Sequence, residues 1–245
     1  MKAGAECGSV SRSPAASRRG PAPFLEWYGA LLRTYGPQGW WPGRSRFEVV
    51  VGAILTQGVA WTNVEKAIRN LKHAGLLRPQ AMRRAGVGRV ARLIRPAGYY
   101  NQKARRLQAF LDLLHTVHRG RLDHLFRQSV ADLRAELLEI RGIGKETADA
   151  IILYAAGKPI FVVDAYTRRI LRRHGEARGD EPYDQIRLLF ERALPPEIAL
   201  LNEYHALVVR LAKHQCRKRQ PLCSGCPLEP HLPPGGPTPD IPAAS

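Results

Sequence analysis

Residues 137–173 read LLEIRGIGKETADAIILYAAGKPIFVVDAYTRRILRR, and this stretch decides the fold prediction. It holds a Gly-x-Gly turn between two apolar helical patterns, and glycines permit a tight turn and the close approach of another backbone. A short apolar run then leads to Asp164, and arginines follow directly. The pattern predicts a helix, a hairpin, a second helix and an extended connector that ends at a single carboxylate.

The helical pattern continues on both sides of this stretch. Apolar residues recur at three- and four-residue spacing, which predicts amphipathic helices. The segments are Phe24–Tyr35, Phe47–Leu55, Val64–Leu71, Ala104–Val117, Leu133–Ile140, Ala148–Ala156, Ile186–Leu194 and Leu200–Ala212. Ser129, with Asp132 three residues on, indicates a helix start. We interpret the short β-rich run Pro159–Val163 as a connector rather than a strand, so the predicted class is all-α with about ten helices.

The two ends of the chain differ from the middle in composition. Residues 1–23 and 233–245 are rich in small residues and proline, which predicts disordered tails. The N-terminal segment has no apolar core of a signal peptide, and no stretch reaches the length of a membrane span. We therefore expect a cytoplasmic protein with no membrane partner.

The charge balance indicates a polyanionic partner. There are 38 Lys and Arg residues against 21 Asp and Glu, a formal net charge of +17, and such a field attracts nucleic acid. From Arg69 to Arg106 there are eleven basic and no acidic residues, with apolar residues between them. That mixture is typical of a folded element with a basic face. The alternative is a basic surface that only faces solvent.

The Gly-x-Gly turn is a candidate phosphate clamp. The N–H groups in the first turn of the following helix lack partners in the helix and can bind an anion. The candidate residues are Arg141, Gly142, Ile143, Gly144, Lys145 and Thr147. Lys145 adds a positive charge there, and Ile143 is expected to insert between the two helices. The alternative is a structural corner that binds no ligand.

This segment resembles the helix-hairpin-helix of the endonuclease III superfamily of DNA glycosylases, and the resemblance extends from Phe24 to Leu232. Val162-Val163-Asp164 stands where that family has its catalytic aspartate. Leu55-Thr56-Gln57 resembles the segment that inserts a glutamine into the DNA stack. Trp40-Trp41-Pro42 and Trp61 resemble one branch, the 3-methyladenine DNA glycosylase III group.

The resemblance implies a two-domain, all-α architecture with a DNA-binding cleft between the domains. A helical barrel domain is expected over 44–157, ending in the hairpin. The second domain is expected to combine 24–43 with 158–232, including a cysteine-rich loop. Asp164 is then expected at the mouth of the cleft. The resemblance further implies a monomer that binds double-stranded DNA with damaged bases and is associated with the nucleoid.

One position separates two kinds of chemistry in that family. Bifunctional members, which also cut the strand, carry a lysine two residues after the second hairpin glycine, and its amine forms a Schiff base. Here this position is Glu146, and Lys145 lies about 100° around the helix. A carboxylate cannot form a Schiff base, which favours a monofunctional glycosylase. Glu146 has a second interpretation, as an acidic residue that favours the positive end of the helix.

Asp164 is the predicted catalytic residue. Cleavage of an N-glycosidic bond develops positive charge on the sugar, much as in glycoside hydrolysis, and a nearby carboxylate stabilises that charge or orients a water. Aspartate is also a good N-cap, and Asp164 can serve both purposes. His205 and Tyr166 are interpreted as packing residues.

The damaged base must leave the duplex to be reached. Trp40, Trp41, Pro42 and Trp61 are candidates to line the pocket, with core packing as the alternative, and Gln57 to fill the vacated space. A π-face attracts a cationic base such as an alkylated purine. We therefore predict a monofunctional glycosylase for alkylated purines. The alternatives are a bifunctional endonuclease III-type enzyme for oxidised pyrimidines and an inactive DNA-binding relative.

Cys216, Cys223 and Cys226 follow the spacing C-x6-C-x2-C, which resembles the family's [4Fe–4S] loop. The fourth cysteine position is Leu232, whereas such clusters are usually held by four cysteines. Three alternatives are open: a cluster with a non-cysteine ligand such as the adjacent His231, a loop that has lost its cluster, and a zinc site.

Overall fold

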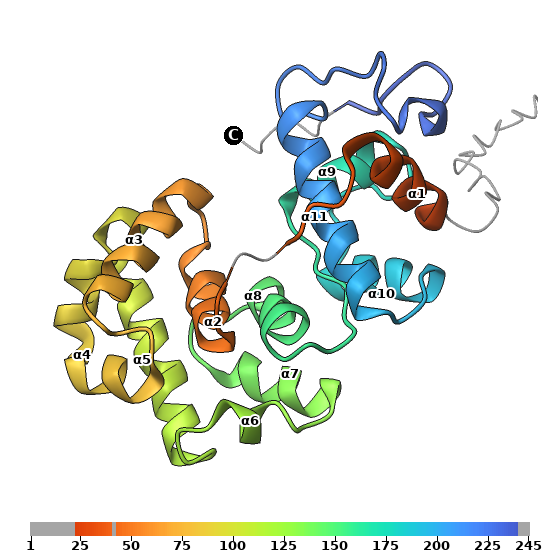
Figure 1. The fold of residues 1–245 in the computed structure, drawn as a ribbon. Coiled ribbons are helices and arrows are strands. Elements are labelled where there is room, and N and C mark those ends of the chain that lie inside the picture. The colour runs from red at the N-terminus through yellow and green to blue at the C-terminus, as the bar shows by residue number, and fades with distance from the viewer. Residues whose placement is uncertain (1–22, 41–42, 240–245) are drawn as a thin grey trace, which may run out of the picture.

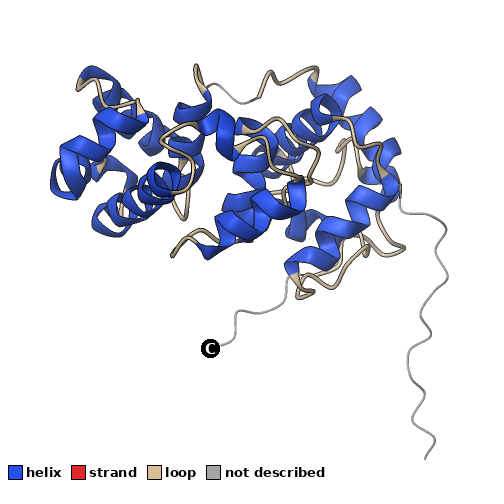
Figure 2. Cartoon of the chain, turned by 90° about the horizontal axis from the view of Figure 1, so that it is seen from below, coloured by secondary structure: helices blue, strands red, loops and turns tan. Residues whose placement is uncertain are grey.

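The structure, a computed structural model, describes residues 23–40 and 43–239, and within these ranges it is helical with no strand (Figure 2). This confirms the all-α prediction. The helices are α1 (Phe24–Tyr35), α2 (Arg46–Leu55), α3 (Trp61–His73), α4 (Pro79–Leu93), α5 (Tyr100–Thr116), α6 (Leu122–Leu125), α7 (Val130–Glu139), α8 (Lys145–Ala150), α9 (Ala165–Arg173), α10 (Tyr183–Ala193) and α11 (Ile198–His214). Short helical turns lie at η1 (Arg95–Ala97), η2 (Ile151–Ala155) and η3 (Glu229–His231). None of the described helices is both long and apolar enough to cross a bilayer.

The helices gather into two groups (Figure 1). One group contains α2 to α8, and the other contains α1 together with α9, α10 and α11. The N-terminal helix α1 packs against α10 and α11, and α9 packs against α11. The chain therefore begins with α1 in the second group, the one that also holds α9 to α11. It then forms all of the first group, α2 to α8, and returns to the second group after η2.

Local sequence explains several helix boundaries. Ser129 begins α7 as predicted, because its hydroxyl accepts the Asp132 N–H at 3.1 Å. Ser45 caps α2 in the same way through the N–H of Glu48. The sequence pattern missed α4, in which Gly86 adopts a non-helical conformation with φ 72° and kinks the helix. Such an interruption breaks the apolar period on which the prediction depends.

The run from 159 to 163 is a connector without strand pairing, as predicted. Its side chains from Ile160 to Val163 are buried. Its backbone finds partners in side chains instead of a neighbouring strand: the Phe161 N–H donates to Glu191 at 3.0 Å, and the Val163 N–H donates to the Tyr183 hydroxyl at 3.2 Å. Buried backbone groups need such partners, and these hold the connector in front of Asp164.

The second hairpin helix departs from the prediction. The pattern indicated one α-helix over Ala148–Ala156, but the chain forms a π-helical turn at Ile151–Ala155, where the Ala156 N–H donates to Ile151 at 3.0 Å. Apolar spacing does not distinguish the two kinds of turn. Single π-turns inside α-helices occur frequently at functional sites.

The predicted tails lie mostly outside the described residues. Residues 233–239 of the C-terminal one are described: they include a turn, and the Thr238 N–H donates to the Arg173 carbonyl at 3.0 Å. Composition alone pointed to disorder here. The backbone partner on α9 explains why this short segment is held against the fold.

Candidate active site

A pocket of about 840 Å³ opens between the two groups of helices. Its walls come from the loop before α3, the start of α8, η2, the connector, α9 and α11. The lining side chains that carry chemistry are Trp40, Gln57, Trp61, Lys145, Glu146, Tyr154, Asp164, His205 and Lys213. Most predicted site residues that the structure describes therefore meet in one cavity, of a size typical of ligand sites.

Asp164 combines the two interpretations drawn from the sequence. Its Oδ1 accepts the backbone N–H of Thr167 at 2.7 Å and the Thr167 hydroxyl at 2.9 Å, so it is the N-cap of α9. The side chain also lines the pocket, with 13% of its surface exposed. Because the cap holds Oδ1, Asp164 presents a fixed carboxylate to the pocket.

His205 stands on the other side of this carboxylate. Its Nε2 lies 3.5 Å from Asp164 Oδ2, an ion-pair distance rather than a well-formed hydrogen bond, and its Nδ1 is hydrogen-bonded to the Tyr154 hydroxyl. The interpretation of His205 as a packing residue was therefore incomplete. No local pattern could reveal it, because α11 reaches Asp164 only in the folded protein.

These contacts set the protonation of Asp164. Burial by itself raises the pKa of a carboxyl, but contacts with His205 and Thr167 outweigh it and leave the pKa of Asp164 below its usual value. The group is therefore ionised at neutral pH, as stabilisation of a cationic sugar requires.

The pKa of Glu146 is shifted in the opposite direction, upward. Its side chain is exposed to the pocket rather than sealed in the core. The surrounding protein nevertheless excludes enough bulk water to raise the pKa of Glu146 to about 7, and the negative charge of Asp164 contributes to the rise. Two carboxyl groups with separated pKa values in one pocket are a common feature of catalytic sites.

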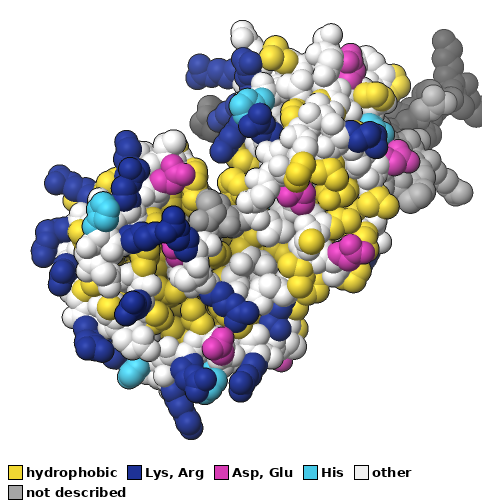
Figure 3. Space-filling view, in the orientation of Figure 1, with side chains coloured by type: hydrophobic (Ala, Val, Ile, Leu, Met, Phe, Trp, Pro, Cys, Tyr) yellow, Lys and Arg dark blue, Asp and Glu magenta, His cyan; other side chains and the backbone are white. Residues whose placement is uncertain are grey.

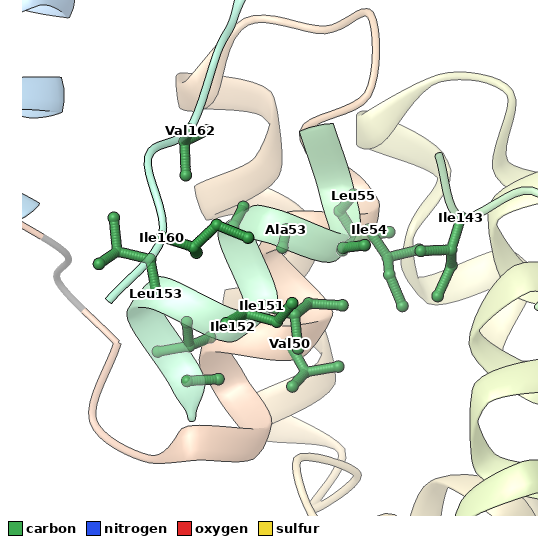
Figure 4. Close-up of a cluster of buried hydrophobic side chains, with 14 of the residues drawn as sticks. Val50, Ala53, Ile54, Leu55, Ile143, Ile151, Ile152, Leu153, Ile160 and Val162 are labelled. Carbon is green, nitrogen blue, oxygen red and sulfur yellow. The ribbon is translucent and has the colours of Figure 1, made fainter. Parts of the chain in front are cut away.

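The hairpin has the predicted form. Gly142 adopts φ +91°, which favours glycine, and a Cβ there would lie 2.5 Å from Arg106 Nε. Ile143 is buried and lies beside Ile54 and Leu55 of α2, so it anchors the turn in the core as expected (Figure 4). Arg141 and Gly144 are exposed at the turn.

Two of the predicted clamp side chains have protein partners. Thr147 is buried, and its hydroxyl accepts Gln57 Nε2 at 2.8 Å. Lys145 Nζ lies 2.5 Å from an Asp184 carboxylate oxygen. The Thr147 hydroxyl therefore faces inward, and a place for Thr147 in a phosphate clamp stays a prediction.

Gln57, the predicted intercalating residue, is held by the hairpin in this structure. Its Nε2 also donates to the Gly142 carbonyl at 3.1 Å, and its Oε1 accepts from Arg106. Any insertion of Gln57 into DNA would require these bonds to break. The contact nevertheless places Gln57 at the edge of the pocket, beside the turn.

Trp40 and Trp61 line the same pocket, with ring centroids 6.1 Å apart and planes tilted by 45°. The Trp61 indole N–H donates to Glu65 at 2.8 Å. Trp41 and Pro42, predicted beside them, lie outside the described residues. Trp40 and Trp61 thus contribute aromatic surface to the pocket, and Trp61 also packs against the core.

Basic side chains gather on the face of the α2–α8 group shown in Figure 3. Within the segment predicted to carry a basic face, Arg78, Arg84 and Arg89 lie on or beside α4 around a depression. Lys213 and Lys145 extend the positive charge to the pocket itself.

Comparisons with known proteins agree with this geometry. Residues 51–196 match the model of the HhH-GPD superfamily of base excision DNA repair proteins. The chain belongs to this superfamily. It is 46% identical over 204 residues, 82% of this chain and 92% of the relative, to MJ1434 of Methanocaldococcus jannaschii, whose name places it among DNA repair glycosylases.

Other relatives of this HhH-GPD protein include endonuclease III of Thermotoga maritima, 29% identical over 76% of this chain and 81% of the relative. Among solved structures, the 3-methyladenine DNA glycosylase MagIII of H. pylori, bound to 1,N6-ethenoadenine, has a TM-score of 0.69. It is 28% identical, and the match covers 78% of this chain and 96% of that one. A non-covalent endonuclease III–DNA complex has a TM-score of 0.73 at 21% identity, over 85% and 92% of the two chains, and this likeness shows the fold.

The cysteine loop of this HhH-GPD protein does not fit a four-cysteine cluster. Within residues 23–40 and 43–239, no group of three or more His, Cys, Asp or Glu side chains is placed to hold a metal ion. The space bounded by the three cysteines, Arg173 and Leu232 is about 10 Å³, room for about one water molecule. The His231 ring packs near Trp27, with centroids 6.0 Å apart.

The side chain of Arg173 instead forms hydrogen bonds with this loop. Its guanidinium lies 3.3 Å from Cys216 Sγ and donates to the carbonyls of Arg217 and Lys218 at 2.6 and 2.9 Å. The arginine is buried, so it satisfies backbone groups that the loop would otherwise leave unpaired.

Proposed function

We propose that this protein is a monofunctional DNA N-glycosylase that flips and excises alkylated purines from double-stranded DNA in base excision repair. The observation that carries the proposal is the pair of carboxyl groups in the pocket. Asp164 is ionised and fixed, and Glu146 occupies the position where strand-cutting relatives carry the reactive lysine. The superfamily assignment supports the class of reaction.

The pocket has the shape and chemistry for such a substrate. Its volume of about 840 Å³ accommodates a flipped purine, and Trp40 and Trp61 offer π-faces that attract a cationic ring. An alkylated purine is cationic and already a good leaving group. The enzyme then needs to stabilise the developing charge on the sugar, which the carboxylate of Asp164 can do.

We expect the protein to release 3-methyladenine or 7-methylguanine from duplex DNA without cutting the strand. Base release and strand nicking should be measured separately, on these substrates and on thymine glycol, by chromatography of the free base and by gel electrophoresis before and after alkali. Release of thymine glycol with nicking would favour the endonuclease III-type alternative. A lack of release from every substrate would favour the inactive DNA-binding alternative.

The endonuclease III-type alternative rests on Lys213, an exposed amine that lines the pocket. If this amine attacked the sugar, borohydride would trap a covalent protein–DNA adduct. We expect no adduct from the wild type and an adduct from Glu146→Lys, which restores an amine at the family position. An adduct from the wild type that disappears in Lys213→Gln would establish the alternative and contradict the monofunctional proposal.

We also propose that the loop of Cys216, Cys223 and Cys226 keeps its shape without an iron–sulfur cluster. The filled space and the Leu232 side chain at the fourth position support this. Protein purified without oxygen should contain well below one iron per chain, and its melting temperature should not change with chelators. About four irons and four sulfides per chain would overturn the proposal, and stoichiometric zinc would indicate the third alternative.

A further inference from the structure

A row of three side chains lies in the wall of the pocket, and two of them, Tyr154 and His205, have no part yet in the proposed reaction. Tyr154, His205 and Asp164 come from η2, α11 and the start of α9. The Tyr154 hydroxyl is hydrogen-bonded to His205 Nδ1, and His205 Nε2 faces Asp164 Oδ2 at 3.5 Å. These contacts end at Asp164 Oδ2, the carboxylate oxygen that the cap of α9 does not use.

The surroundings limit the hydrogen-bond partners that are available to His205 Nε2. The imidazole is 7% exposed, and Nε2 makes no hydrogen bond within the part of the chain that the structure describes. A buried polar group without a partner is costly. Asp164 Oδ2 is the acceptor within reach, so a small closing movement would convert the contact into a hydrogen bond.

The tautomer of a neutral His205 ring follows from its two neighbours. A neutral imidazole carries its proton on one nitrogen. A bare Nε2 lone pair facing a carboxylate would be repelled, so the favourable tautomer has its proton on Nε2 and accepts the Tyr154 hydroxyl at Nδ1. Burial raises the pKa of Tyr154 well above its usual value, so this hydroxyl stays a donor. The π-turn places Tyr154 in this position.

We propose that His205 is a positioning residue, fixed by Tyr154, that holds the carboxylate of Asp164 oriented and ionised for the reaction. The proposal rests on the proposed function and deepens it. A ring N–H that faces Oδ2 favours the ionised carboxylate, whose charge must remain available to the developing cation on the sugar. Thr167 holds one carboxylate oxygen, and His205 holds the other.

Other charged groups face the same space and define what the test must control. Glu146 projects from α8 and raises the energy of the ionised Asp164. Arg168 on α9 and Lys213 on α11 contribute positive charge to the region. Substitution of His205 also removes an influence that lowers the pKa of Glu146, whereas Tyr154→Phe leaves His205 and all of these groups in place.

The test compares His205→Leu, His205→Gln and Tyr154→Phe with the wild type, by single-turnover base release across a range of pH. Loss of the donor should raise the pKa of the buried Asp164, so the ionised form is lost at a higher pH. We expect His205→Leu to release base about 100-fold more slowly. The acid limb of its pH–rate profile, where the rate falls as Asp164 is protonated, should move upward by about one to two pH units. His205→Gln, whose Nε2 can take the place of the ring nitrogen, should keep the acid limb near that of the wild type.

Tyr154→Phe should slow release and move the acid limb upward by less than His205→Leu, because the ring keeps its Nε2–H but loses its orientation. Affinity for undamaged duplex should be unchanged in all three variants, which shows that they are folded. Slower release with an unmoved acid limb in both His205→Leu and Tyr154→Phe would overturn the proposal. If His205→Leu fails to fold, the comparison of Tyr154→Phe with His205→Gln still decides. Absence of release by the wild type would refute the proposed function instead.

Discussion

Asp164→Asn is expected to lower the rate of base release by at least about 100- to 1000-fold. The substitution keeps the size of the side chain but removes the negative charge that stabilises the developing cation on the sugar. Single-turnover release of a methylated purine from duplex DNA measures the effect. In the wild type, the lowered pKa of Asp164 keeps this charge present down to acidic pH.

The cap of α9 provides the control for this variant. Asparagine caps a helix about as well as aspartate, so Asp164→Asn should still accept the Thr167 N–H and remain close to the wild type in stability and DNA affinity. Asp164→Ala loses both functions and should be destabilised by about 1 kcal/mol. Retained base release in Asp164→Asn would show that the carboxylate acts as a cap alone.

Arg134→Met is expected to destabilise the protein by about 3–5 kcal/mol, because it leaves a buried carboxylate without its partner. Arg134 of α7 lies 2.6 Å from Asp149 of α8, whose side chain is fully buried, and 2.6 Å from Asp184 of α10. The arginine therefore joins both helices of the hairpin to the second group. Denaturant unfolding at neutral pH measures the loss.

The effect should depend on pH with a definite sign. Burial already raises the pKa of Asp149 against the opposing influence of Arg134, and removal of Arg134 raises it further. A carboxyl whose pKa is higher in the folded protein destabilises the fold above that pKa, and the penalty disappears below the unfolded value of about 3.9. The destabilisation by Arg134→Met should therefore shrink as the pH falls.

Two further variants separate this explanation from a loss of packing. Arg134→Met combined with Asp149→Asn removes the unpaired charge and should recover part of the stability. Arg83→Met removes an exposed ion pair with Asp112, 3.3 Å long, and should cost less than about 1 kcal/mol. A loss in Arg134→Met that is independent of pH and unchanged in the double variant would contradict the charge argument.

Local chemistry explains which features could be predicted from the sequence. The hairpin follows from Gly142 and its flanking apolar periods, and the position of Asp164 follows from its spacing to that hairpin. The cap at Ser129 follows from the hydroxyl and the helix that begins after it. Each of these features depends on residues within a few turns of one another, where backbone geometry leaves few alternatives.

The contacts that set the chemistry of the site depend on residues far apart in the chain. His205 lies 41 residues from Asp164, and Gln57 lies 90 residues from Thr147. Lys145, predicted to add positive charge to the phosphate clamp, lies beside Asp184 of α10.

The sequence by itself determined most of the helices, the hairpin, the catalytic candidate and the carboxylate at the family's lysine position, because each is encoded in local spacing and residue type. Only the tertiary structure decided which side chains meet in the pocket, how Asp164 stays ionised and what fills the cysteine loop. The physical reason is that pKa values and hydrogen bonds depend on distance and burial. Packing between the two groups of helices sets both.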